Sequence, residues 1–383
     1  MNEQQPRNLP GYQFSSVFEK SRVTSSYKFF WFDAILDLLK ESASSPKPRF
    51  LSEYDLYNRM ILKARPVSQY YKLFFGSQDS LPEIIENLFP LKENGSNEVI
   101  AGFDIDSNTL LNSILDKKNA AALKKAHAKL GRYVKTAFLS PWATAGELNN
   151  YTNQNWQSHD SLPLYRIVEK NIEIHPRWYG YLMEHMGIMK AFCRWHMTEY
   201  FQTKNPFVPG IAGKLDLVQE RKSLNSERQV WQRFSEEGNS LTCIYSNESL
   251  KNMTEIDIDH FIPWSFVLHN QVWNTAPVSS SINRSKSDRL PPKNSIHRFA
   301  TIQFKLLKWL LAREAQYKKY LEQYSVLFHG KALVFEKQEF ENALGKALNT
   351  QIEVARGMGF SDWDGVGHLT THPTSTSPPP TKK

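Results

Sequence analysis

The chain has 383 residues, of which 40% are hydrophobic, and this composition excludes general disorder and allows two or three domains. Its two cysteines, Cys193 and Cys243, can form neither a disulfide framework nor a four-thiolate zinc site, and its polar N-terminus lacks a secretory signal, so we expect a cytoplasmic protein. The formal net charge of +8 favours a polyanionic partner, without establishing one.

The first half of the chain is predicted to be mainly helical. Residues 1–20 are polar, and we expect them to be flexible. Beyond them, apolar residues recur at spacings of three and four, which is typical of helices that bury one face. Helices are predicted from Ser25 or Ser26 to Leu38, from Tyr54 to Ile61, over 81–89 and within 108–138. We assign residues 21–237 to a helical domain that positions DNA or senses a trigger.

A single long helix is predicted over 179–201, with apolar residues on nearly all sides. Its His185, Cys193, His196 and Glu199 are interpreted as ordinary core residues, because no second pair of metal ligands accompanies them. A charged helix follows over 221–237, and a basic amphipathic helix is predicted over 299–324. Residues 299–364 are assigned to C-terminal helices and 365–383 to a disordered tail, so the expected fold class is mainly α.

The segment 238–298 carries a different pattern. From Glu255 to His260 acidic and apolar residues alternate, which is the period of a half-buried strand. Pro263 ends this strand, an irregular stretch follows over 264–270, and residues 272–275 predict a return strand. A helix that begins near 279–281 then carries Asn283 and Lys286. The expected order is therefore strand, loop, strand, helix.

These residues suit the hydrolysis of a phosphodiester bond. The reaction needs a base that titrates near neutral pH, which the imidazole of His260 provides. It also needs a cation that offsets charge on the phosphate, and the oxygens of Asp259 and Asn283 suit a hard ion such as Mg²⁺. Adjacent side chains of a strand point to opposite sides, so Asp259 and His260 can share a site only if the chain bends there.

Three short elements, DIDHFIPWSF, WNTAP and NRSKSDRLP, together resemble the HNH nuclease family, and in particular the HNH domain of CRISPR effector nucleases. The resemblance implies a small ββα-metal module within the mainly α chain and an endonuclease activity. It assigns catalytic roles to His260, which activates water, to Asn274, which ties the loop, and to Lys286, which lies near the phosphate. Asp259 and Asn283 are the implied metal ligands, and Arg284, Lys286 and Arg289 the implied nucleic-acid contacts.

One departure concerns zinc. Many members of the family hold this motif between two Cys-x-x-Cys pairs, whereas here Ser246 lies where the second thiol is expected after Cys243. We therefore expect no structural zinc, and Mg²⁺, Mn²⁺ or another divalent ion at the active site. DNA is the expected partner, with RNA, a regulatory protein and a homodimer left open. The alternative functions are a nucleic-acid-binding module and a dormant nuclease that a partner activates.

Overall fold

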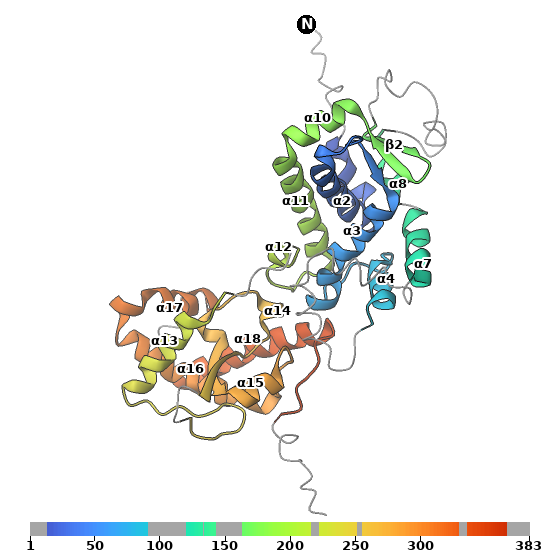
Figure 1. Ribbon diagram of the computed structural model, residues 1–383. Helices are drawn as coiled ribbons and strands as arrows, with labels where there is room; N and C mark the ends of the chain where they lie inside the picture. The colour runs from blue at the N-terminus through green and yellow to red at the C-terminus, as the bar shows by residue number, and fades with distance from the viewer. Residues whose placement is uncertain are drawn as a thin grey trace, which may run out of the picture. The chain divides into compact units, whose positions relative to one another are not determined.

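The computed structural model describes residues 14–90, 120–132, 134–142, 163–215, 222–250, 255–328 and 335–365. The fold is mainly α, with small antiparallel sheets, and the chain divides into two units, Met1–Gln219 and Glu220–Lys383 (Figure 1). In the described part of the chain, no helix is long and apolar enough to cross a membrane. The predicted tail 365–383 lies almost entirely outside the described residues.

Helix α2 (Tyr27–Glu41) forms the centre of the first unit. Its apolar residues include Phe29, Phe30, Trp31 and Phe32, all of which are buried, and the helix lies between α3 (Glu53–Arg65) and α11 (Met186–Lys204) (Figure 1). Burying one such side chain contributes about 1.5–3 kcal/mol. The other helices of this unit are α4 (Leu81–Leu88), α7 (Ala120–Gly131), α8 (Val134–Phe138), α10 (Pro176–Glu184) and α12 (Ile211–Lys214).

A three-stranded sheet, which the sequence analysis did not anticipate, completes the first unit. Strands β1 (Phe50–Ser52), β3 (Asn171–Ile174) and β2 (Tyr165–Val168) lie in that order and pair antiparallel. The strands are only three and four residues long, so they carry little of the alternating pattern that identifies a strand. The carboxylate of Glu173 pairs with Arg49 and Arg166, which ties the sheet to the segment before β1.

Three predicted features of this chain are corrected by the structure. Within the segment 1–20, expected to be flexible, Phe14, Val17 and Phe18 are buried, because their spacing places them on one apolar face. The helix predicted over 179–201 is broken at His185, whose backbone is not helical, and forms α10 and α11. The helix predicted over 299–324 is likewise two helices, separated near Arg313.

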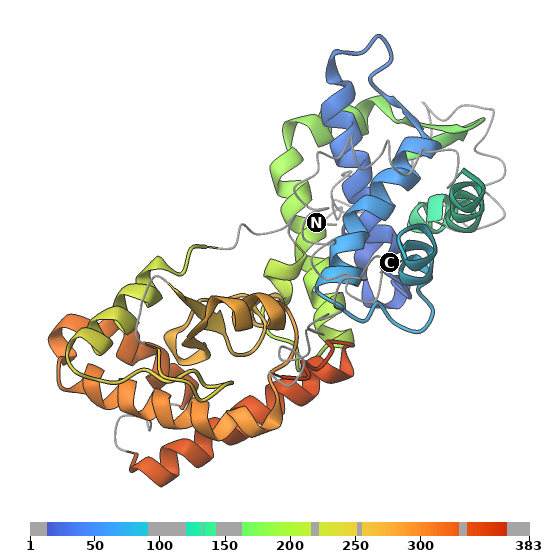
Figure 2. The same cartoon turned by 60° about the horizontal axis from the view of Figure 1, so that its bottom comes forward.

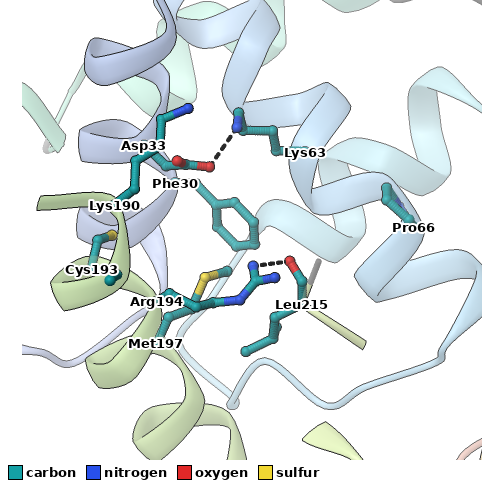
Figure 3. Close-up of a pocket in the computed structure, with 10 residues that line it drawn as sticks. Phe30, Asp33, Lys63, Pro66, Lys190, Cys193, Arg194, Met197 and Leu215 are labelled. Atoms are coloured by element: carbon teal, nitrogen blue, oxygen red, sulfur yellow. Dashed lines mark hydrogen bonds and ion pairs between the residues drawn. The ribbon is translucent and has the colours of Figure 1, made fainter. Parts of the chain in front are cut away.

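A cavity of about 500 Å³ in the first unit is lined by residues of α2, α3 and α11 (Figure 3). The Lys63 ammonium points toward the carboxylate of Asp33 and also lies 2.7 Å from Asp37. Lys190 lies 2.6 Å from the other oxygen of Asp37. These ion pairs link three helices, and the basic groups of this cavity therefore serve the packing of the unit.

His127 couples the stability of the first unit to pH. Its Nε2 lies 2.8 Å from Asn58 Oδ1, its ring packs against Tyr54 and Tyr57, and burial lowers its pKa from 6.5 to about 4. The unfolded chain therefore binds a proton more readily than the folded chain between these values, so stability falls as the pH falls through this window. We expect the melting temperature of the wild type to fall more between about pH 7 and about pH 5 than that of His127→Gln.

The control for this comparison is His297→Gln, at an exposed position of the second unit. Its melting temperature should change with pH as that of the wild type does. Equal pH dependence of all three proteins would show that His127 does not contribute.

The second unit combines a β-hairpin with helices that support it. The hairpin consists of β4 (Ile256–His260) and β5 (Thr275–Ser279), with the short helix α14 (Trp264–Val267) in its loop and α15 (Ser280–Lys286) after it. Helices α16 (Ile296–Leu311) and α18 (Lys337–Gly357) lie side by side (Figure 2), and α17 (Glu314–Leu327) packs on α16. The predicted order of strand, loop, strand and helix is present.

Helix α13 (Asn225–Glu236) belongs to this second unit, although the sequence analysis placed residues up to 237 with the first domain. It packs on β5, and the indole nitrogen of its Trp231 donates a hydrogen bond to Thr275 Oγ1 at 3.3 Å. The boundary between the two units lies before α13, because this helix packs on the hairpin. Such a tertiary contact leaves no local signal in the sequence.

Candidate active site

The β-hairpin places the acidic and imidazole side chains of the motif. Ile256 pairs with Ser279 and the register continues regularly to His260, which pairs with Thr275. The return strand begins at Thr275, and residues 272–274, expected to belong to it, form a 3-10 turn instead. Pro277 is accommodated opposite Ile258 because β5 is an edge strand of a two-stranded sheet.

Asn274 closes the loop between the two strands. Its side-chain amide donates to the Ile262 carbonyl at 3.0 Å and accepts from the Ile262 backbone N–H at 2.9 Å. Its own carbonyl accepts from Phe261 N at 2.9 Å, and the residue is completely buried. These hydrogen bonds hold the turn that follows His260, which is where the resemblance places the tie of the loop.

We expect Asn274→Ala to lower the free energy of unfolding by about 2–4 kcal/mol, because the buried N–H and carbonyl of Ile262 both lose their partner. Urea denaturation measures this loss. Asn239→Ala is the matched control, since the Asn239 amide makes a single part-buried bond, to Phe234 O. If the two variants lose equal stability, Asn274 is not a tie of the loop.

Asp259 is buried and accepts hydrogen bonds from Tyr245 and Lys286. Its Oδ2 accepts from the hydroxyl of Tyr245 at 2.8 Å, and its Oδ1 lies 3.1 Å from the ammonium of Lys286, which also donates to the His260 carbonyl at 2.8 Å. Burial raises the pKa of Tyr245, and the neighbouring carboxylate raises it further, so the hydroxyl remains a donor at neutral pH. Asp259 is therefore held in one orientation by two residues far from it in sequence.

Asn283 lies on the same face of the hairpin as Asp259. Its side-chain nitrogen donates to Asp257 Oδ2 at 3.1 Å, and Asp257 also lies 3.6 Å from Arg228. Asp257 and Asp259 are two apart on β4, and the residues that contact them, Asn283 and Lys286, are three apart on α15. A spacing of two keeps the aspartates on one face of the strand, and a spacing of three keeps Asn283 and Lys286 on one face of the helix, so this face gathers oxygen atoms from Asp257, Asp259 and Asn283.

The imidazole of His260 contacts the loop between β4 and β5. Its Nε2 lies 3.0 Å from Asn270 Oδ1, while the Asn270 amide nitrogen donates to the Lys222 carbonyl at 2.8 Å, which fixes the orientation of that amide. Because the Asn270 oxygen can only accept, Nε2 donates in this contact. The pairing continues through Asp259 and His260, and the chain turns directly after His260, so the bend that the two side chains need to share a site belongs to this end of the strand.

The three basic residues assigned to nucleic acid lie in different surroundings. Arg284 is exposed on α15, where a phosphate can reach it. Arg289 is half-buried and donates to the carbonyls of Lys286 and Ser285, so it caps the end of this helix. Lys286 is fully buried and bound to Asp259, an arrangement that the sequence did not suggest.

The segment that begins at Cys243 is held by the C-terminal helices. Arg298 of α16 donates to the carbonyls of Ile244, at 2.6 Å, and Tyr245, and Phe299 stacks on Phe261 with 4.0 Å between ring centroids. The Trp363 ring packs edge-on against Tyr245. Helix α16 thus supports the residue whose hydroxyl holds Asp259.

Sequence reasoning missed Tyr245 and Asn270 as site residues. Nothing in the sequence distinguishes the hydroxyl of Tyr245 from that of any buried tyrosine. A catalytic histidine generally has a partner that orients it, so a polar residue in the following loop was a reasonable candidate, but only the fold selects Asn270.

Comparison with known proteins agrees with this geometry. The sequence model of the HNH endonuclease family matches residues 243–292, the segment that holds Tyr245, the hairpin and α15. A CRISPR-associated endonuclease Cas9 from Streptococcus mutans is 33% identical over 76 residues, which cover 19% of this chain and 6% of that protein. The chain thus matches only a small part of that relative's length, and no solved structure matches. Residues 243–292, with the ββα arrangement of β4, β5 and α15, belong to the HNH endonuclease family.

Proposed function

We propose that the protein is a divalent-metal-dependent endonuclease that hydrolyses phosphodiester bonds in DNA. The observation that carries this proposal is the gathering of Asp259 and Asn283 on one face of β4, with His260 next in the chain at the end of the strand. The family match supports it, because HNH endonucleases act with a divalent metal ion. The relative's printed name, a CRISPR-associated endonuclease, supports a role in restriction or phage defence.

The donor atoms fit a hard cation. Carboxylate and amide oxygens are the ligands that Mg²⁺ and Mn²⁺ accept, and Mg²⁺ usually binds through one or two carboxylates together with water and substrate phosphate. Among the described residues, no three or more His, Cys, Asp or Glu side chains lie close enough together to hold a metal ion by themselves. We therefore propose Asp259 and Asn283 as the protein ligands, with the remaining positions supplied by solvent and DNA. A bound divalent cation would offset the negative charge that develops on the phosphate.

We propose His260 as the general base. Asn270 fixes the proton on Nε2, so Nδ1 is the atom that accepts a proton from the attacking water. Asn274 shapes the turn after His260 and thereby keeps the imidazole at the end of the strand. Arg284, exposed on α15, is proposed to contact the DNA backbone.

The test is incubation of the purified chain with plasmid DNA and Mg²⁺, with and without a chelator. We expect cutting only with the metal, and new ends bearing a 5′-phosphate, detected by ligation to an adaptor. An RNA of the same sequence in a parallel reaction decides between the two nucleic acids. Absence of cutting with every metal and substrate would contradict the proposal.

A second candidate is a module that binds nucleic acid without cutting it. The observation that favours it is that both oxygens of Asp259 already accept hydrogen bonds from this chain. It predicts binding that weakens with salt, that a chelator does not affect, and that leaves no new strand ends.

A further inference from the structure

The folded chain itself supplies a cation to Asp259. The Lys286 ammonium lies 3.1 Å from Asp259 Oδ1, and the exposed fraction of the side chain is 0% for the lysine and 4% for the aspartate. A buried charge is tolerated only when it is paired, so this contact neutralises the carboxylate inside the domain. The ammonium also donates to the His260 carbonyl, which fixes it between the two residues of the Asp-His pair.

Tyr245 restricts how Asp259 can bind anything else. Its hydroxyl occupies Oδ2 at 2.8 Å, and Phe261 and Trp363 pack against its ring, so the hydroxyl cannot easily turn away. A metal ion that binds Oδ1 therefore meets the ammonium of Lys286. Two positive charges side by side repel each other strongly in a buried site. An incoming divalent ion thus has to displace Lys286 or bind weakly beside it.

We propose that Lys286 competes with the metal ion for Asp259 and that a phosphate of the DNA relieves this competition. This rests on the proposed nuclease function. The ammonium has a flexible stem, and Lys286 is the last residue of α15, directly before Ser287, whose φ of 50° takes the chain out of the helix. When a phosphate arrives, Lys286 exchanges Asp259 for an oxygen of that phosphate. Metal and DNA then bind together, and metal alone binds poorly.

The experiment measures Mn²⁺ binding by calorimetry, with and without a short DNA duplex, in a His260→Ala background that prevents cutting. Alanine keeps the backbone carbonyl to which Lys286 donates. Lys286→Gln removes the charge but keeps a donor for Asp259, and we expect it to bind Mn²⁺ about tenfold or more tightly than the Lys286 protein without DNA. DNA should strengthen Mn²⁺ binding in the Lys286 protein about tenfold more than it does in Lys286→Gln.

Two further variants control for charge and for burial. Lys286→Arg keeps the positive charge, and we expect no gain in affinity for Mn²⁺. Lys214→Met removes a fully buried lysine of the first unit, whose ammonium donates to the Pro209 carbonyl, and should leave Mn²⁺ binding unchanged. Circular dichroism confirms that each variant is folded, and Lys286→Met replaces Lys286→Gln if the latter is not.

The outcomes separate the two proposals. If wild-type protein cuts DNA but Lys286→Gln binds Mn²⁺ no more tightly than the Lys286 protein, Lys286 is a structural partner of Asp259 and the competition is excluded. If wild-type protein neither cuts DNA nor binds Mn²⁺ in its presence, the proposed nuclease function fails as well.

Discussion

Replacing His260 with alanine is expected to slow DNA cleavage by about 10²–10⁴-fold, the usual contribution of a general base. The side chain is 2% exposed, and its Nε2 contacts Asn270, so its loss removes the group proposed to take the proton from water. Metal and DNA binding should change little, because His260 is not a proposed ligand. Initial rates of plasmid nicking in Mg²⁺ measure the effect.

His297→Ala is the matched control for this variant. His297 is an exposed histidine on α16 of the same unit, and its loss should leave the rate within about twofold of the wild type. Equal loss of rate in both variants would indicate a general effect of histidine substitution. Full activity of His260→Ala would exclude this residue as the base.

The Asp259–Lys286 pair should show strong coupling in a double-mutant cycle without added metal. Asp259→Asn leaves a buried ammonium and Lys286→Met leaves a buried carboxylate, so each is expected to cost about 3–5 kcal/mol of unfolding free energy. The double variant removes both charges and should be more stable than either single variant. It should remain inactive, because the proposed metal ligand is gone. Chemical denaturation of the four proteins gives the coupling energy.

The control cycle uses the exposed pair Lys129 and Glu83, whose atoms lie 2.7 Å apart. Solvent screens an exposed ion pair, so little coupling is expected there. If the Asp259–Lys286 cycle gives no more coupling than this surface pair, the contact is incidental, and the competition with metal loses its basis.

The sequence predicts β4 and α15 of the second unit well, because their signals are local, whereas it places the return strand three residues too early. Alternation of acidic and apolar residues up to His260 identifies β4, and the serines before Asn283 identify the start of α15. The short strands β1, β2 and β3 could not be found in this way, because they depend on pairing between distant segments. The break at His185 was also hidden, since the apolar pattern continues across it.

The partners of the site residues required the fold. Tyr245 lies fourteen positions before Asp259 and Lys286 lies 27 after it, so no spacing rule joins them. Lys286 looked like a solvated phosphate contact because lysine is almost always exposed. The structure buries it instead, because the face of α15 that packs on β4 carries both Asn283 and Lys286.

The most direct test of the central claim is a crystal structure of the His260→Ala variant with Mn²⁺ and DNA, in which anomalous scattering locates the ion. We expect one Mn²⁺ within about 2.5 Å of oxygens from both Asp259 and Asn283 and in contact with a DNA phosphate. An ion bound elsewhere, with Asp259 still held by Tyr245 and Lys286 while DNA is present, would contradict it.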